Sequence, residues 1–280
     1  MTVGSHWATG AGDTNQGPRA RNEDSYLSRG NVHIVADGMG GHHAGAAASA
    51  AVVETFAALA DLPVVTPPEV AAAVVQAQRA VLEVSLSVGG ESGTTVTGAV
   101  AVEHDGGPWW MILNVGDSRT YLVDGDVVHQ VTRDHSHVQD LVDAGRITAE
   151  EAERHPDRNI VTRAIGDGLP EFDAWLVPVM PGMRLVVASD GLTKVVSDAR
   201  IGVTAGSAEE PQTAASALVN EALALGTGDN VTVVVADVLD AVTPPGLSVA
   251  PWRLWGEQWE PADDDLEDDT TQTSRRRARV

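Results

Sequence analysis

The hydrophobic positions of this chain fall into short β-branched runs and longer alanine-rich runs, which predict two kinds of element. The alanine-rich run at 42–61 favours a helix, and a second helix is predicted from 67 to about 88, where prolines open the first turn. Residues 136–156 and 207–225 also have helical character, and the second of these is amphipathic. Strands are predicted in the β-branched runs 32–36, 94–103, 109–115, 119–124, 127–132, 185–188 and 231–238.

The order of these elements predicts the fold class. Strand runs and helix pairs are segregated rather than alternating, which favours an α+β layered fold with antiparallel sheets over a doubly wound parallel sheet. Glycine-aspartate pairs at 116–117 and 125–126 separate several strands, as in the short turns of an antiparallel meander.

The character of the sequence changes after about residue 240. Prolines at 244–245 break regular structure, and tryptophans, an acidic run at 263–269 and an arginine-rich end at 275–279 follow. Opposite charge blocks of this kind are usually disordered. We therefore predict one domain over residues 1–240 and a disordered tail over 241–280; docking of this tail on a partner or on the domain is the alternative.

Composition excludes several classes of protein. The chain has 280 residues, 18 basic and 40 acidic side chains, and no cysteine. The net charge of −22 disfavours a nucleic-acid partner, and the missing cysteine excludes disulfides and cysteine nucleophiles. The only lysine, Lys194, follows Thr193 rather than glycine, so there is no P-loop. No long apolar run or secretory signal is visible, which predicts a cytoplasmic protein without a membrane span.

Four aspartates stand at the ends of predicted strands. Asp37, Asp117 and Asp190 follow strands, and Asp229 precedes the last one. Carboxylates projecting from strand ends into one rim would repel one another and raise their pKa values unless a cation lies between them. Oxygen ligands without cysteine indicate Mg²⁺ or Mn²⁺ rather than zinc. Taken singly, each aspartate is also compatible with an ordinary turn.

The sequence around these aspartates agrees with a known family. The matching segments are Arg-Ala-Arg-Asn-Glu-Asp-Ser at 19–25, Ala-Asp-Gly-Met-Gly-Gly-His at 36–42, Ser-Gly-Thr-Thr at 92–95, Val-Gly-Asp-Ser-Arg at 115–119, Thr-Arg-Asp-His-Ser at 132–136, His-Pro at 155–156, Ala-Ser-Asp-Gly-Leu at 188–192 and Asp-Asn-Val-Thr at 229–232. In this order they resemble the bacterial branch of the PPM/PP2C family of metal-dependent protein serine/threonine phosphatases. The resemblance runs from about residue 9 to 238.

The resemblance implies an α-β-β-α sandwich of two antiparallel sheets flanked by helix pairs, with two or three Mn²⁺ or Mg²⁺ ions at one edge. The implied ligands are Asp37, which bridges two ions; the Gly38 backbone carbonyl; Asp190 and Asp229; Asp117, which shares a third ion with Asp190; and Glu23, through a metal-bound water, with Asp24 as a second candidate for that contact. The glycine-rich Ser-Gly-Thr-Thr segment is expected to be structural.

The implied activity is hydrolysis of phosphoserine and phosphothreonine in proteins by a metal-activated water, opposing bacterial serine/threonine kinases. A guanidinium can bind two phosphate oxygens at once, and Arg19 fits this role by its spacing to Asn22. The family commonly places two residues between a preceding glycine and this arginine, whereas one separates Gly17 from Arg19. Arg21 is therefore an alternative phosphate-binding residue.

Two further sets of residues are candidates. His42 or His43 could protonate the leaving oxygen, and a structural hydrogen bond at a helix start is the alternative. Residues 134–166 resemble the mobile flap of the family, with a solvated loop as the alternative. The candidate substrate contacts on this flap are His135, His155 and Arg163.

The complete set of aspartates favours an active enzyme, expected to act as a monomer on phosphorylated proteins. A catalytically silent relative that binds phosphopeptides for regulation is the alternative, which missing ligands would favour. A two-metal nuclease is disfavoured by the acidic charge of the chain.

Overall fold

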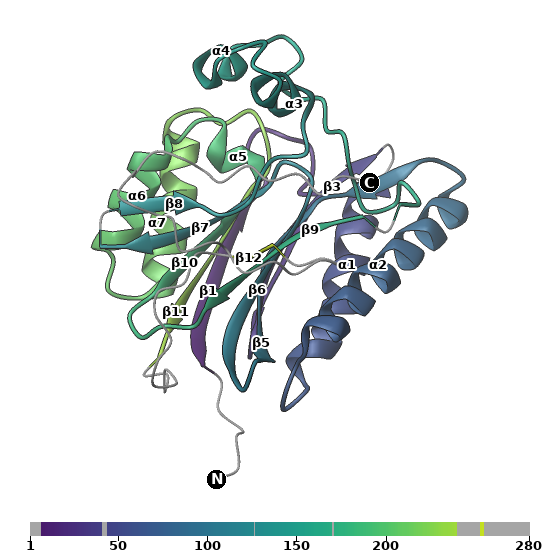
Figure 1. Cartoon of the computed structure of the whole chain (residues 1–280). Helices are drawn as coiled ribbons and strands as arrows, with labels where there is room; N and C mark the ends of the chain where they lie inside the picture. Colours follow the sequence, from purple (N-terminus) through teal and green to yellow (C-terminus); the bar gives the residue numbers. More distant parts are fainter. Residues whose placement is uncertain (1–6, 41–43, 126, 170, 240–252, 255–280) are drawn as a thin grey trace.

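Two antiparallel β-sheets lie face to face between two layers of helices (Figure 1). The computed structural model describes residues 7–40, 44–125, 127–169, 171–239 and 253–254. The larger sheet has the order β12 (Arg253–Leu254), β9 (Asp173–Pro178), β6 (Gly107–Val115), β5 (Val96–His104), β3 (Val32–Gly40) and β2 (Asp24–Arg29), with β4 (Ser92–Thr94) paired to β3. The smaller sheet has the order β1 (Ala8–Asn15), β11 (Val231–Val238), β10 (Arg184–Ala188), β7 (Arg119–Asp124) and β8 (Val127–Gln130).

The helices cover the outer faces of both sheets. The larger sheet is covered by α1 (Ala44–Ala60) and α2 (Pro67–Val88), and the smaller by α5 (Asp190–Thr193), α6 (Asp198–Ser207) and α7 (Pro211–Ala224). Two short helices, α3 (His137–Asp143) and α4 (Ala149–Glu153), stand at one end of the sandwich (Figure 1). This architecture confirms the predicted α-β-β-α sandwich.

The β6 strand shows how side-chain alternation builds the layers. Met111 and Leu113 pack with the residues of α1 and α2, whereas Trp110 and Ile112 point to the opposite face and pack between the two sheets. Successive side chains of a strand point to opposite faces, so a strand buried on both faces reads as a continuous apolar run. This is why β6 was visible in the sequence as an apolar run rather than an alternating pattern.

Several elements depart from the sequence prediction. β1, β2, β9 and α6 were missed, and the predicted helix 207–225 is the shorter α7, which begins with Pro211 at its first turn. The β1 sequence, Ala-Thr-Gly-Ala-Gly-Asp-Thr-Asn, lacks a β-branched run but pairs along its whole length with the valine-rich β11. β3 continues beyond the predicted stop at Asp37 because β4 pairs with Gly38, Met39 and Gly40.

Part of the predicted tail is described. Arg253 and Leu254 pair with Leu176 and Trp175 of β9, so two residues of the segment 241–280 extend the larger sheet. The other residues of that segment lie outside the described part of the chain. The domain boundary near residue 240 stays a prediction.

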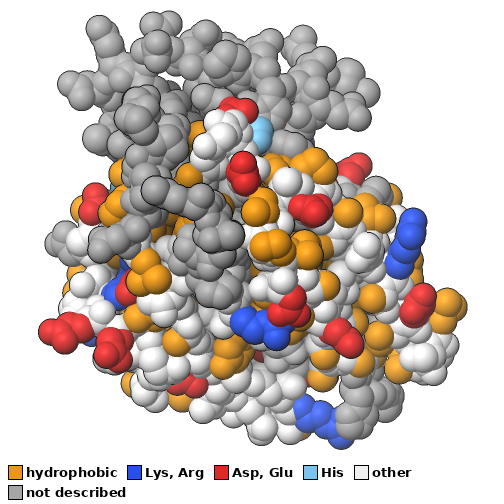
Figure 2. All heavy atoms as spheres, turned by 90° about the horizontal axis from the view of Figure 1, so that it is seen from below, with side chains coloured by type: hydrophobic (Ala, Val, Ile, Leu, Met, Phe, Trp, Pro, Cys, Tyr) orange, Lys and Arg blue, Asp and Glu red, His pale blue; other side chains and the backbone are white. Residues whose placement is uncertain are grey.

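The surface opposite α3 and α4 is chemically mixed. Figure 2 shows this end of the sandwich, where the Lys and Arg side chains of the described residues stand apart from one another among acidic, apolar and polar groups. The visible described part of this face therefore offers no concentrated basic patch. Among the described helices, none has both the length and the hydropathy needed to cross a bilayer.

Candidate metal centre

The four predicted aspartates meet at one end of the sandwich, where strands of both sheets end. Asp37 lies on β3 of the larger sheet, and Asp117 lies in the connection from β6 of the larger sheet to β7 of the smaller one. Asp190 begins α5 after β10, and Asp229 precedes β11 in the smaller sheet. The negative charges of the other three all act on Asp37, so the four carboxylates form one electrostatic cluster.

The cluster holds more negative charge than its environment favours. Loss of hydration raises the pKa of Asp37 well above its ordinary value, and the charges of Asp24 and Asp190 raise it further. Burial, followed by the charge of Asp190, raises the pKa of Asp117 to about 7. Burial also raises the pKa of Asp24 to about 6 and contributes most to the raised pKa of Asp229. A bound cation would relieve this repulsion.

Two carboxylate oxygens at the centre are buried without a hydrogen-bond partner among the described residues. They are Oδ1 of Asp24 and Oδ1 of Asp190. The other oxygen of Asp24, Oδ2, accepts hydrogen bonds from Ser189 Oγ at 2.9 Å and from Thr232 Oγ1 at 2.7 Å. Asp24 belongs to the larger sheet and both hydroxyls to the smaller one, so this contact joins the sheets beside the cluster. Unpartnered buried carboxylate oxygens fit Mg²⁺ or Mn²⁺, which prefer oxygen ligands.

Two cations of the chain itself contact the cluster. Lys194 Nζ is hydrogen-bonded to Asp190 Oδ2 and lies 4.0 Å from Asp117 Oδ2. Arg19 Nη2 lies 2.7 Å from Asp229 Oδ2, and Arg19 Nε donates to the Gly228 carbonyl at 2.9 Å. Within the described residues, no three His, Asp or Glu side chains are already arranged around a metal position. The charges and donor types fit metal ions, while Arg19 and Lys194 hold two of the carboxylates.

The structure places Arg19 beside the cluster and adds a residue that the sequence motifs did not indicate. The Arg19 guanidinium contacts Asp229; its phosphate-binding role stays a prediction, with Arg21 as the alternative. In the sequence, Lys194 only excludes a P-loop. Its four-residue spacing from Asp190 within a helical segment was the available signal, because such residues share a helix face.

Backbone contacts fix the position of Asp37. Its amide donates to Thr95 Oγ1 at 3.0 Å, and its carbonyl accepts from Thr95 N and Thr94 Oγ1, both at 2.9 Å. A Cβ atom on Gly38 would lie 2.2 Å from the Gly45 carbonyl oxygen of α1, so only glycine fits there. The Ser-Gly-Thr-Thr segment is thus a support for the centre. The metal contact of the Gly38 carbonyl stays a prediction.

Asn230 holds the loop that carries the candidate residues Arg19 and Glu23. Its Oδ1 accepts from the Glu23 amide at 2.9 Å, and its Nδ2 donates to the carbonyls of Gln16 at 2.8 Å and Arg21 at 2.7 Å. A Cβ atom on Gly45 would lie 2.7 Å from Glu23 Oε2, so the glycine makes room for this carboxylate beside α1. The Asp-Asn motif therefore links β11 to the opposite loop.

The base of the predicted flap is anchored by a buried histidine. His135 is only 1% exposed; its Nδ1 accepts from the Gly116 amide at 3.2 Å and its Nε2 lies 3.2 Å from Asp173 Oδ2. Arg163 Nη1 lies 3.2 Å from Asp173 Oδ1. Although burial acts to raise the pKa of Asp173, the hydrogen bond with His135 and the nearby Arg163 guanidinium lower it overall. Burial leaves no surface of His135 for a substrate, so its expected substrate contact is replaced by an anchoring role.

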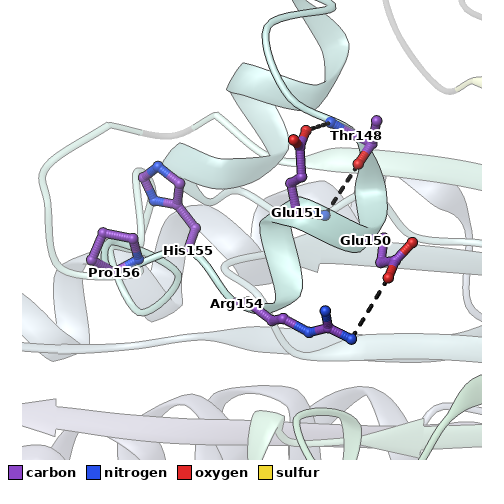
Figure 3. A pocket seen from close by; sticks show the side chains of 6 residues that line it. All are labelled: Thr148, Glu150, Glu151, Arg154, His155 and Pro156. Carbon is purple, nitrogen blue, oxygen red and sulfur yellow. Dashed lines mark hydrogen bonds and ion pairs between the residues drawn. The ribbon is translucent and has the colours of Figure 1, made fainter.

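The outer part of the flap carries a hollow around α4 (Figure 3). Thr148 and Glu151 form a capping box: the Glu151 amide donates to Thr148 Oγ1 at 3.1 Å and the Thr148 amide to Glu151 Oε2 at 2.8 Å. His155 lines this hollow, and its Nδ1 accepts from the Asp157 amide at 3.2 Å.

Substrate contacts by His155 and Arg163 stay predictions. His42 and His43, the candidate general acids, lie outside the described residues.

The fold and the site together define a layered α+β protein with an acidic, metal-compatible centre between two antiparallel sheets. The family model of protein phosphatase 2C matches residues 11–224. A serine/threonine phosphatase stp of Listeria innocua is 36% identical over 218 residues, which cover 74% of this chain and 84% of the relative. The chain therefore belongs to the protein phosphatase 2C family.

Relatives from Mycobacterium tuberculosis add structural detail. The serine/threonine phosphatase PstP is 39% identical over 230 residues, which cover 79% of this chain but only 43% of that protein. This chain therefore matches less than half the length of that curated relative. A crystal structure of PstP superposes with a TM-score of 0.76 at 36% identity, covering 83% of this chain and 99% of that one. Another, of the PstP catalytic domain in complex with two manganese ions, has a TM-score of 0.75.

Proposed function

We propose that the chain is a metal-dependent protein phosphatase that hydrolyses phosphoserine and phosphothreonine in proteins. The observation that carries this proposal is the cluster of repelling carboxylates, with unpartnered buried oxygens, in a phosphatase fold. The manganese-bound relative supports Mn²⁺ or Mg²⁺ as the cofactor. Phosphorylated proteins are the proposed substrates and serine/threonine kinases the proposed opposing activity, with the cytoplasm as the proposed location and a monomer as the proposed state.

The residues that would hold two metal ions are at the centre of the cluster. They are Asp37, the Gly38 carbonyl, Asp190, Asp229 and, through water, Glu23. Bound metal ions would lower the pKa of a water molecule and neutralise the phosphoryl oxygens. The carboxylates supply the charge that retains the ions, and the contacts of Thr94 and Thr95 keep Asp37 in place.

Arg19 is the proposed residue that binds the phosphate group of the substrate. Its side chain is 56% exposed and ends at Asp229, so the guanidinium can exchange this carboxylate for two phosphate oxygens without crossing the core. A buried arginine would be too restricted for this exchange.

The missing cysteine excludes a thiol nucleophile, and direct attack by water needs no covalent intermediate. His42 remains the proposed donor of a proton to the leaving seryl or threonyl oxygen.

Phosphate release from a phosphothreonine peptide in Mn²⁺ tests the proposal, with the same peptide carrying phosphotyrosine as a specificity control. We expect release that stops when a chelator removes the metal and returns when Mn²⁺ is restored. Release that is indifferent to the chelator would contradict a metal-dependent mechanism. Tight binding of the peptide in saturating Mn²⁺ without any release would instead favour the silent, phosphopeptide-binding alternative.

A further inference from the structure

Lys194 stands where the sequence resemblance leads us to expect a third metal ion. That ion would be shared by Asp117 and Asp190 in this chain. Lys194 Nζ is hydrogen-bonded to Asp190 Oδ2 and lies 4.0 Å from Asp117 Oδ2, so it contacts both of these carboxylates. We propose that the Lys194 ammonium replaces the third metal ion, so that this centre is completed by two metal ions and one built-in positive charge.

The local backbone directs Lys194 to this position. Lys194 follows the one-turn helix α5, and its amide bonds to the Asp190 carbonyl at 2.9 Å, which places the two side chains on one face. Asp117 lies in the connection from β6 of the larger sheet to β7 of the smaller one. The lysine therefore links α5 to this connection between the sheets.

The two carboxylate oxygens of Asp190 have different partners. Oδ2 is held by Lys194, whereas Oδ1 is buried without a partner among the described residues. Oδ1 is therefore available to one of the two metal ions that the proposed function requires. Asp117 is different, because the resemblance gives it no metal besides the third ion, and Lys194 is the cation whose charge acts against the burial and the repulsion from Asp190 that raise its pKa.

A third divalent ion does not fit while Lys194 stays in place. The ion would need the oxygens of Asp117 and Asp190 that face the ammonium, and two cations on one pair of carboxylates repel each other. The Lys194 side chain is 32% exposed, while those of Asp117 and Asp190 are 7% and 11% exposed. Expelling the ammonium would leave these two enclosed carboxylates to the metal alone. We therefore expect the positive charge at this corner to be independent of metal concentration.

This inference rests on the proposed metal-dependent function, and the number of bound ions tests it. Equilibrium dialysis against Mn²⁺ should give two ions per chain for the wild type and three for Lys194→Asp, which exchanges the ammonium for a ligand. Arg200→Met is the matched control, because it removes a cation that pairs with Glu221 between α6 and α7 and contacts none of the four aspartates in the described contacts, and it should bind two. Three ions on the wild type would overturn the inference alone, and no bound ion would overturn the proposed function as well.

A second measurement needs no variant and so does not depend on how Lys194→Asp folds. Lys194 is the only lysine of the chain, so lysine labelled with ¹³C at Cε gives a single side-chain resonance. During titration with Mg²⁺, this resonance should keep the broad line of an immobilised side chain up to saturation. A sharp line at the position of free lysine would show that metal displaces the ammonium, and this result would overturn the inference.

Discussion

Two groups of charged side chains at the same end of the molecule differ in how they are neutralised. At the metal centre, burial and mutual repulsion raise the pKa values of Asp24, Asp37 and Asp117. At the base of the flap, Asp173 has a lowered pKa because His135 and Arg163 compensate for its burial. The first group is incomplete without an external cation and the second is complete as it stands. Unbalanced charge thus distinguishes a functional site from a structural anchor.

Changing one carboxylate in each group should separate activity from stability. Asp190→Asn should lower kcat/KM for a phosphothreonine peptide at least about a hundredfold, because the centre loses a proposed metal ligand that is also held by Lys194. Asp173→Asn should lower it less than about tenfold and reduce the free energy of unfolding by about 1–2 kcal/mol. Steady-state kinetics in saturating Mn²⁺ and urea unfolding measure both quantities. Equal activity losses would abolish the distinction between the two groups.

The ion pair between Arg119 and Asp134, near the flap, should contribute to stability but not to catalysis. Arg119 donates to Asp134 through Nε at 2.9 Å and Nη2 at 2.8 Å, and these side chains are 27% and 10% exposed. Arg119→Met should reduce the free energy of unfolding by about 2–4 kcal/mol, at the lower end for breaking a buried pair because Arg119 is partly solvated. Urea denaturation measures this loss, and Mn²⁺ should not reverse it. A loss below about 1 kcal/mol would show that the pair is effectively solvated.

The metal-free centre should make stability fall as the pH rises. The pKa values of Asp24 and Asp117 are about 6 and about 7 in the folded chain, against 3.8 ordinarily. The folded state thus holds these protons more tightly, so the stabilisation present below pH 4 is lost as the pH rises to about 7. Shifts of about 2 and about 3 pKa units set an upper bound of about 7 kcal/mol on this contribution, since one pKa unit corresponds to about 1.4 kcal/mol.

Chelator-treated wild type and Asp117→Asn, unfolded in urea between pH 4 and pH 8, isolate this effect. The variant should show a smaller fall in the free energy of unfolding, because it lacks one of the carboxylates whose pKa is raised. Mn²⁺ added above pH 7 should stabilise the wild type by compensating the carboxylates of the proposed two-ion site, whereas Asp117 keeps Lys194 as its cation. Identical pH profiles for the two proteins would contradict the raised pKa of Asp117.

The smallest effect is expected from an exposed pair on the flap. Glu150 on α4 and Arg154, which directly follows α4, form an ion pair (Figure 3). The two charged groups lie 3.6 Å apart, and the side chains are 76% and 79% exposed. Arg154→Ala should change the free energy of unfolding by less than about 0.5 kcal/mol, because solvent screens the pair. A change above about 1 kcal/mol in urea unfolding would show that α4 contributes more to the domain than its exposure indicates.

The elements that the sequence predicted well are those whose own residues dictate them. The helix α2 begins and ends where predicted, with a proline at its first turn and Gly89 in a left-handed conformation at its end. The strands β7 and β11 also match, because β-branched runs between turns leave few alternatives. The strand β1 could not be found in this way, since its small and polar residues become a strand only by pairing with β11.

The candidate site, like the fold, has features that the sequence predicts and features that only the tertiary structure reveals. The sequence by itself determined which residues carry the carboxylates, that turns follow the strands, and which family the motifs resemble. Only the tertiary structure decided that His135 is buried, that Asp24 reaches Ser189 and Thr232, and that Lys194 meets Asp117. The physical reason is that the centre is built across two sheets. A chain pattern specifies the face on which a side chain lies, whereas packing of one sheet on the other specifies which charges become neighbours.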